Sequence, residues 1–254
     1  MIDLHIEGPI ATVTLCRPPV NAINDEWVNR FDEVLDTIAA ADAVAVVWLR
    51  STQKVFCAGA DLAMMRNILA SAEGRARMIA MTRRMQEVFE RIETLPKTTL
   101  AEIAGPALGG GFELALSCDL RIVADSARVG LPEAALGLLP AGGGTQRMTR
   151  ICGEATARRL ILGAETIGGE EAVRLGLAQW CVPGAQLEDF ARATAARIAG
   201  LPPRALAECK ACIDVSAKGG ADGYEIELAG SGALLAMPET LARVARFLEG
   251  RRGA

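Results

Sequence analysis

The sequence predicts an α/β fold over residues 1–185, followed by a helical part over residues 186–254. Three observations lead to this prediction. Short apolar runs alternate with longer stretches of helical periodicity. Residues 43–49 form a continuous, valine-rich apolar run, which is typical of a strand buried on both faces. Beyond Gln186 the pattern stays helical to the end of the chain.

The first elements follow from local signals. Residues 4–7 and 10–15 are predicted strands, separated by the turn pair Gly8-Pro9. A helix is predicted from about Asn24, whose side chain can cap it, with apolar residues at helical spacing from Trp27 onward. The next predicted elements are a strand at 43–49, a helix at 73–92, a strand at 98–104, a helix at 111–117 and a strand at 120–124.

In the carboxy-terminal part, prolines indicate where helices begin. Pro202-Pro203 and Pro238 each predict a new helix, because proline in the first turn leaves no further donor unsatisfied. The pattern is compatible with packing of these helices on their own core or on another subunit.

The overall charge argues against one class of partner. The chain has 254 residues, 51% of them apolar and 23% charged, with a net charge of −4. That balance is ordinary for a globular protein and disfavours nucleic-acid binding, which relies on a dense positive face. The grouped residues Arg147, Arg150, Arg158 and Arg159 are interpreted as a solvated helix face.

Two further features bear on location. Every long apolar stretch is interrupted, as residues 39–49 are by Asp42, so no membrane span is predicted. Polar residues Asp3, His5 and Glu7 stand where a signal peptide would be apolar. We expect a cytoplasmic protein.

The cysteines and the single histidine limit the chemistry. Seven scattered cysteines are typical of small buried residues in a reducing compartment. Cys209 and Cys212 are interpreted as neighbours on one helix face. Because the only histidine is His5, neither a metal site nor a histidine-dependent triad is expected. The sequence also lacks the glycine-rich phosphate and dinucleotide motifs, so no cofactor is expected.

Two glycine-rich segments, residues 57–61 and 105–111, each follow a predicted strand and precede a helix. Such a segment often only allows tight packing. However, small residues at a helix start also expose backbone N–H groups at the positive end of the helix dipole. Two such loops together could offer two N–H groups to one oxygen that becomes negative during a reaction.

These segments, read with two others, resemble the crotonase superfamily of enoyl-CoA hydratases and isomerases. The matching motifs, in family order and spacing, are FCAGADL (56–62), GPALGGGFELALSCD (105–119), GLPE (130–133) and GLLPAGGGTQR (137–147). Residues 17–24 and 238–251 are also similar, so the likeness covers essentially the whole chain. It implies a crotonase-like ββα spiral core, helices that serve oligomerisation and pocket closure, an acyl-CoA thioester substrate, and trimers or hexamers.

The resemblance also implies the site residues. The amides of Ala60 and Gly110 would form an oxyanion hole for the thioester carbonyl. Further residues expected to contact substrate are Ala58, Asp61, Leu62, Ala63 and Gly109.

Two glutamates bear on the reaction type. Glu113 and Glu133 match the pair that hydratases of the superfamily carry, whereas isomerases often keep only the second. The resemblance assigns Glu113 to orienting and activating water, and Glu133 to proton transfer at Cα. Without the family, they would be interpreted as a helix-start charge and a surface residue.

Some positions depart from the common pattern. Ala63 stands where many hydratases carry lysine, and Ala141 replaces a frequent glycine. Met64 and Met65 are compatible with either a roof over the acyl pocket or ordinary core. The basic candidates for the coenzyme A phosphates are Arg17 and Lys54.

Several alternatives stay open. Within the superfamily these are double-bond isomerisation, a carnitinyl-CoA-type dehydration and methylglutaconyl-CoA hydration. From a different class, we consider a non-catalytic RNA-binding member. The sequence indicates neither the acyl group nor the stereochemistry.

Overall fold

The computed structural model describes residues 1–219 and 221–252. Its main sheet has six strands in the order β1-β2-β3-β4-β6-β9. The first pair is antiparallel, and every later neighbour is parallel. The strands are β1 (Ile2–Glu7), β2 (Ile10–Leu15), β3 (Val46–Ser51), β4 (Thr98–Ile103), β6 (Leu120–Ala124) and β9 (Trp180–Val182).

A smaller sheet stands beside it. Its strands β5 (Ala107–Leu108), β7 (Arg128–Gly130) and β8 (Thr166–Gly168) pair in the order β5-β7-β8. Two isolated bridges, Ile23 with Ala60 and Cys57 with Ala107, join the first glycine-rich segment to its surroundings. The small sheet and the bridges therefore bring both glycine-rich segments to one place.

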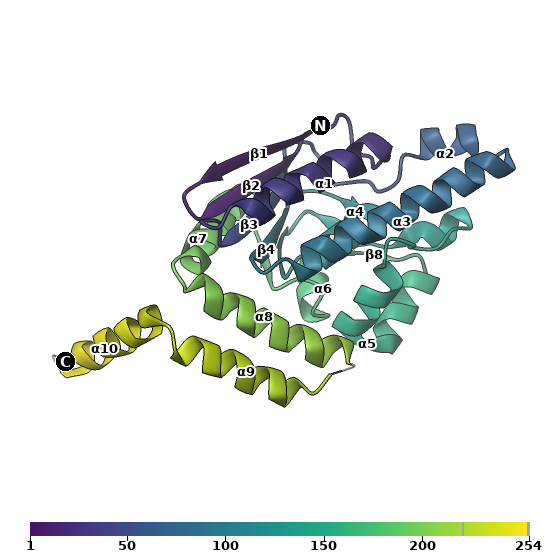
Figure 1. Ribbon diagram of the computed structural model, residues 1–254. Coiled ribbons are helices and arrows are strands. Elements are labelled where there is room, and N and C mark those ends of the chain that lie inside the picture. Colours follow the sequence, from purple (N-terminus) through teal and green to yellow (C-terminus); the bar gives the residue numbers. More distant parts are fainter. Residues whose placement is uncertain (220, 253–254) are drawn as a thin grey trace.

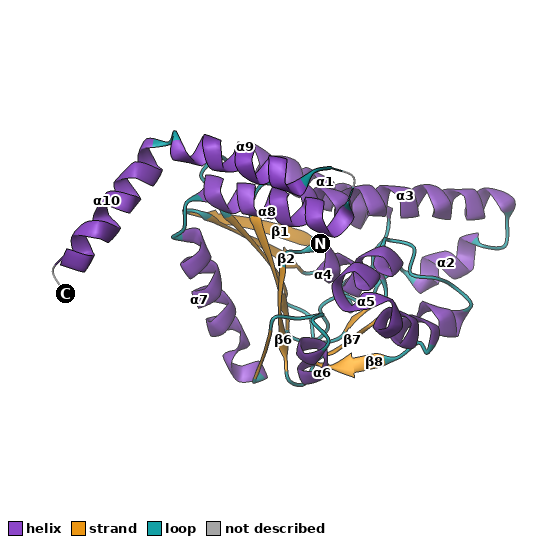
Figure 2. Ribbon diagram, turned by 90° about the horizontal axis from the view of Figure 1, so that it is seen from below, coloured by secondary structure: helices purple, strands orange, loops and turns teal. Residues whose placement is uncertain are grey.

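Helices cover both faces of the main sheet. Figure 2 shows α7 (Leu187–Ala199) on one side and α3 (Ala72–Thr94), α4 (Gly110–Ser117) and α5 (Gly144–Leu162) on the other. The remaining helical elements are α1 (Asp25–Ala40), α2 (Leu62–Ile68), η1 (Pro132–Leu136), α6 (Gly169–Arg174), η2 (Gly184–Gln186), α8 (Pro203–Lys218), α9 (Gly223–Leu235) and α10 (Pro238–Arg252). The predicted α/β fold with a helical carboxy-terminal part is confirmed.

The predicted start of α1 is confirmed at atomic detail. The Asn24 side chain accepts a hydrogen bond from the Trp27 N–H at 2.9 Å, and the helix begins at Asp25. The predicted strand 43–49 begins too early, because β3 starts at Val46. Val44 and Ala45 are buried, but the Val44 N–H donates to the Ala41 carbonyl, just after α1, and the Ala45 N–H donates to the Pro9 carbonyl, in the turn between β1 and β2. An apolar run reports burial, and here burial extends beyond the strand.

The packing changes after α7. This helix contributes Leu187, Ala191 and Ala195 to the main core. In contrast, α8 has no fully buried residue, α9 lies along α8 on the side away from the sheet, and α10 points away from the rest of the chain (Figure 1 and Figure 2). Helical character thus begins near residue 186 as predicted, while α7 belongs to the core by its contacts. The division of the chain into parts 1–185 and 186–254 stays a prediction. Residues 253 and 254 of the second part lie outside the described residues.

The seven cysteines fall into three groups, of which two are buried, four are partly buried and one is exposed. Cys57 and Cys118 are buried as predicted, whereas Cys209 is exposed on α8, so that expectation is wrong there. Cys212 lies on the same helix, as predicted.

Within residues 1–219 and 221–252, no helix has both the length and the apolar character needed to span a membrane.

Candidate active site

The two glycine-rich segments touch backbone to backbone. A β-carbon at position 59 would lie 2.9 Å from the Gly110 nitrogen, and one at position 111 would lie 2.0 Å from the Cys57 oxygen. Any side chain there would force the segments apart. Gly59 and Gly111 therefore allow tight packing of the two segments, which was the alternative interpretation, and they bring Ala60 beside the start of α4.

Two N–H groups at this junction have no hydrogen-bond acceptor among the described residues. In the bridge, the Ile23 N–H donates to the Gly59 oxygen at 2.8 Å, and the Ile23 oxygen accepts from the Asp61 N–H at 3.0 Å. The intervening Ala60 N–H has no acceptor among the described residues. Gly110 is the first residue of α4, where an N–H has no intrahelical acceptor. A β-carbon on Gly110 would lie 3.7 Å from the Ala60 nitrogen, so the two residues are neighbours in the fold.

Glu113, in the first turn of α4, packs against a third glycine-rich stretch, the turn at residues 142–144. Its Oε1 accepts a hydrogen bond from the Gly144 N–H at 2.7 Å. β-Carbons at positions 142 and 144 would each stand 2.7 Å from one of its carboxylate oxygens, so a side chain at either position would displace the carboxyl group. The side chain is 1% exposed. Burial raises the pKa of Glu113 to about 7, and the charge of Glu133 adds to the rise.

Glu133 is the second residue of η1, and its carboxyl group approaches Gly109 in the second glycine-rich segment, residues 105–111. Its Oε1 would lie 2.8 Å from a β-carbon on Gly109, which has φ +54°, a conformation that favours glycine. Its Oε2 is buried without a hydrogen-bond partner among the described residues. Burial also raises the pKa of Glu133. This carboxyl oxygen therefore has a hydrogen-bonding capacity that none of the described residues uses.

The other predicted contact residues lie around the start of α2. Ala58, Leu62 and Ala63 are exposed. Asp61 is engaged within the protein, because it caps α2 through the Met64 N–H at 3.1 Å and pairs with Arg17 at 3.1 Å. Arg17 also donates to the Ala22 carbonyl.

Methionines form an apolar cluster beside the free amides. Met65, Met78 and Met81 are buried together, and Ala60 and Met64 pack against them. Both interpretations of Met64 and Met65 therefore have support, since the cluster is packed like core and it adjoins Ala60. Methionine adapts its shape readily, which suits a surface that meets an acyl chain.

Three residues around Glu113 were not recognised from the sequence as part of the candidate site, namely Gly142, Gly144 and Arg147. Gly142 and Gly144 surround Glu113, and their only sequence signal was the glycine run itself. The expected solvated face is wrong for Arg147, which is 7% exposed, and holds for Arg158 and Arg159. No group of three or more His, Cys, Asp or Glu side chains is arranged to hold a metal ion within the described residues.

The raised pKa of Glu113 predicts a pH-dependent stability. Between the ordinary value of 4.5 and about 7, the folded protein holds a proton that the unfolded chain has released, so stability falls as pH rises through this window. The whole fall amounts to about 3 kcal/mol. Glu113→Gln removes this titration. Urea unfolding of both proteins should show the parent losing stability relative to the variant between about pH 5 and pH 8. A difference that does not change with pH would contradict the prediction.

Comparison with known proteins identifies the family. The chain matches the enoyl-CoA hydratase/isomerase family over residues 5–228. It belongs to this family. The resemblance drawn from the four motifs is thereby confirmed, and with it the class of enzyme.

Members of the family match at the level of whole chains. The short-chain-enoyl-CoA hydratase of Clostridium acetobutylicum is 38% identical over 215 residues, covering 84% of this chain and 80% of that protein. The crotonyl-CoA hydratase of Syntrophomonas wolfei is 33% identical, covering 99% and 96%. The crystal structure of an enoyl-CoA hydratase from Bacillus anthracis superposes with a TM-score of 0.90 at 30% identity, covering 98% of this chain and 96% of that one.

Proposed function

We propose that this protein adds water across the double bond of a 2-enoyl-CoA thioester to form a 3-hydroxyacyl-CoA, and catalyses the reverse dehydration. One observation carries the proposal. The Ala60 and Gly110 amides, for which no acceptor is found among the described residues, lie in the same part of the fold as the buried Glu113, on the helix that Gly110 begins, and the partly buried Glu133, beside Gly109. The names of the hydratase relatives support the same reaction.

The amides supply the electrophilic part of the site. The thioester carbonyl oxygen accepts hydrogen bonds from the Ala60 and Gly110 N–H groups. When the water oxygen bonds to Cβ, the electron pair of the double bond moves toward this carbonyl and forms an enolate oxygen. Amides already fixed by the bridge and by α4 need no reorganisation to meet that charge. Ala58, Leu62 and Ala63 line the approach to this oxygen, and Asp61 maintains the segment through its cap.

The carboxyl groups divide the proton transfers. Glu113 in its ionised form takes a proton from the attacking water, and protonated Glu133 delivers a proton to Cα. The pair therefore works with one proton shared between two groups. Their raised pKa values support this state near neutral pH, because burial disfavours ionising both.

A turnover assay tests the function. Purified protein is incubated with crotonyl-CoA and with longer and branched 2-enoyl-CoAs, and loss of the enoyl thioester absorbance is followed. We expect hydration of at least one of them, unchanged after dialysis against a chelator, since we propose no metal or organic cofactor. Absence of turnover would contradict the hydratase. An RNA-binding assay beside it tests the non-catalytic alternative, which the net charge of −4 disfavours.

We further propose a cytoplasmic homo-oligomer of three or six chains. The cysteines, none of which forms a disulfide in the structure, favour a reducing compartment. Apolar side chains stand exposed on the last three helices, namely Ile213, Leu228, Leu235 and Leu241. Burial of this surface against a neighbouring subunit would stabilise an assembly. Light scattering should show three or six chains, and Leu228→Glu with Leu241→Glu should lower the mass. A stable monomer of the parent would contradict the assembly.

A further inference from the structure

The turn 142–144, which contacts Glu113, is bound on its other side by the side chains of Arg147 and Gln86. The Arg147 side chain folds back from the first turn of α5, and its Nη1 donates to the Gly142 oxygen at 2.9 Å. Its Nη1 would lie 2.3 Å from a β-carbon on Gly143, which has φ +103°. Gln86 of α3 donates to the Ala141 oxygen at 2.6 Å. The carbonyls of the turn thus face these donors, while its Gly144 N–H faces Glu113.

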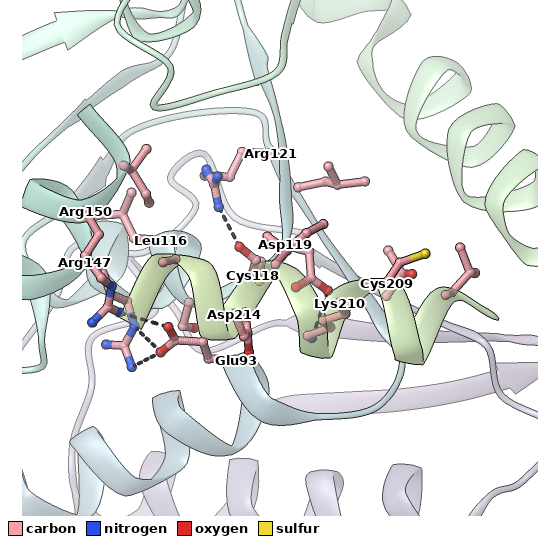
Figure 3. Close-up of a pocket in the computed structure, with 17 residues that line it drawn as sticks. Glu93, Leu116, Cys118, Asp119, Arg121, Arg147, Arg150, Cys209, Lys210 and Asp214 are labelled. Carbon is pink, nitrogen blue, oxygen red and sulfur yellow. Dashed lines mark hydrogen bonds and ion pairs between the residues drawn. The ribbon is translucent and has the colours of Figure 1, made fainter. Parts of the chain in front are cut away.

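A carboxylate on α3 orients Arg147. Glu93 Oε2 lies 2.9 Å from both Nε and Nη2 of Arg147. The other oxygen, Oε1, pairs with Arg150 at 2.9 Å and with Lys218 of α8 at 3.4 Å. Figure 3 shows Arg147 and Arg150 converging on Glu93. The group lies at a cavity of about 400 Å³ that is also lined by Leu116 near the end of α4.

The location of Arg147 is unfavourable without these partners. A cation in the first turn of a helix meets the positive end of the helix dipole, and Arg147 is buried as well. Burial of a charge is tolerated when it is paired and hydrogen-bonded. Glu93 supplies the pair, and the Gly142 oxygen supplies the remaining contact. The guanidinium therefore links α3 and α5 to the turn.

We propose that Arg147, oriented by Glu93, is a positioning residue that fixes the turn 142–144 and thereby the carboxyl group of Glu113. The inference rests on the function proposed above. If the turn shifts, the Gly144 N–H leaves Glu113, and the carboxylate loses its alignment with the attacking water. Misalignment of about 1 Å at a reacting group can lower a rate about a hundredfold.

Arg150 provides a matched control. It contacts the same Glu93 carboxylate as Arg147, and no hydrogen bond joins it to the turn 142–144 among the described residues. We expect Arg147→Met to lower kcat about ten- to a hundredfold with little change in KM, and Arg150→Met to stay within about threefold of the parent. Equal losses in the two variants, or none in Arg147→Met, would overturn the proposal.

The pH profile separates positioning from general loss of stability. The charged groups acting on Glu113 are Glu133, which disfavours its ionised form, and Arg147, which favours it. Removing the Arg147 charge should therefore move the pH limb of kcat/KM that reports Glu113 upward. Arg147→Lys keeps a charge but has no guanidinium to bridge Glu93 and Gly142, so its pH limb should stay near the parent while kcat remains lowered. A limb that does not move in Arg147→Met would overturn the proposal.

A stability measurement, which needs no enzyme activity, separates this inference from the proposed function. The free energy of unfolding is measured against pH for the parent and for Arg147→Met, each with and without Glu113→Gln. The same pair is made with Arg147→Lys, which serves alone if Arg147→Met does not fold. We expect the pH-dependent fall to grow in Arg147→Met and to stay near that of the parent in Arg147→Lys, whose charge remains. Either variant departing from its own expectation would overturn the proposal. This result holds whether or not the parent hydrates an enoyl-CoA.

Discussion

Glu113→Gln and Glu133→Gln are each expected to lower turnover of a 2-enoyl-CoA by about 10²–10⁴-fold, the usual contribution of a general acid or base. Glutamine keeps the size and much of the hydrogen bonding of glutamate but neither accepts nor delivers the proton. Binding of the thioester should change little, because the free amides remain. The measurement is kcat for each variant beside a binding constant for a saturated acyl-CoA.

A matched control and a second readout sharpen this test. Glu102 of β4 is also buried, at 3% exposure, and lies outside the site, so Glu102→Gln controls for loss of a buried carboxylate. Exchange of the Cα proton with solvent should depend mainly on Glu133, since that step needs no attacking water. If Glu113→Gln stays within about threefold of the parent, well below the usual acid–base range, the two-carboxylate mechanism is wrong. The single-glutamate isomerase would then replace it.

The second large effect is expected at the backbone. Gly110→Pro removes one of the two free N–H groups, and proline is tolerated at the first position of a helix. Loss of one such donor typically lowers kcat by about 10²–10³-fold, or about 3–4 kcal/mol of barrier. The effect should appear in kcat, since the charge on the carbonyl oxygen develops only during the reaction.

Gly110→Ala is the control for this change. A β-carbon at position 110 meets Gly59 and Ile23 at 3.4 Å, which is ordinary contact, and alanine keeps the N–H. The proline variant should therefore be at least tenfold slower than the alanine variant, with circular dichroism confirming that both are folded. Equal activity of the two would show that the Gly110 amide does not bind the reacting oxygen.

The sequence by itself determined the local elements and the family. Asn24 could be recognised as a cap because a cap depends on residues three positions away. The strands β2 and β6 were predicted with their observed bounds, since their composition reflects burial. The glycines of residues 57–61 and 105–111, with Glu113 and Glu133, were found because their order and spacing match the family. The structure brings all of them to one site.

Only the tertiary structure decided what surrounds Glu113. Glycine is favoured at positions 142 and 144 because a carboxylate about thirty residues earlier in the chain occupies the space that their side chains would need. Arg147 was misjudged because its partner Glu93 lies on another helix, far away in the sequence. Likewise, the amphipathic pattern of α7 predicts an apolar face but does not indicate whether that face packs on the sheet or on another subunit. The structure places it in the core. Local preferences depend on neighbouring residues, whereas burial and charge pairing depend on which distant segments meet in the fold.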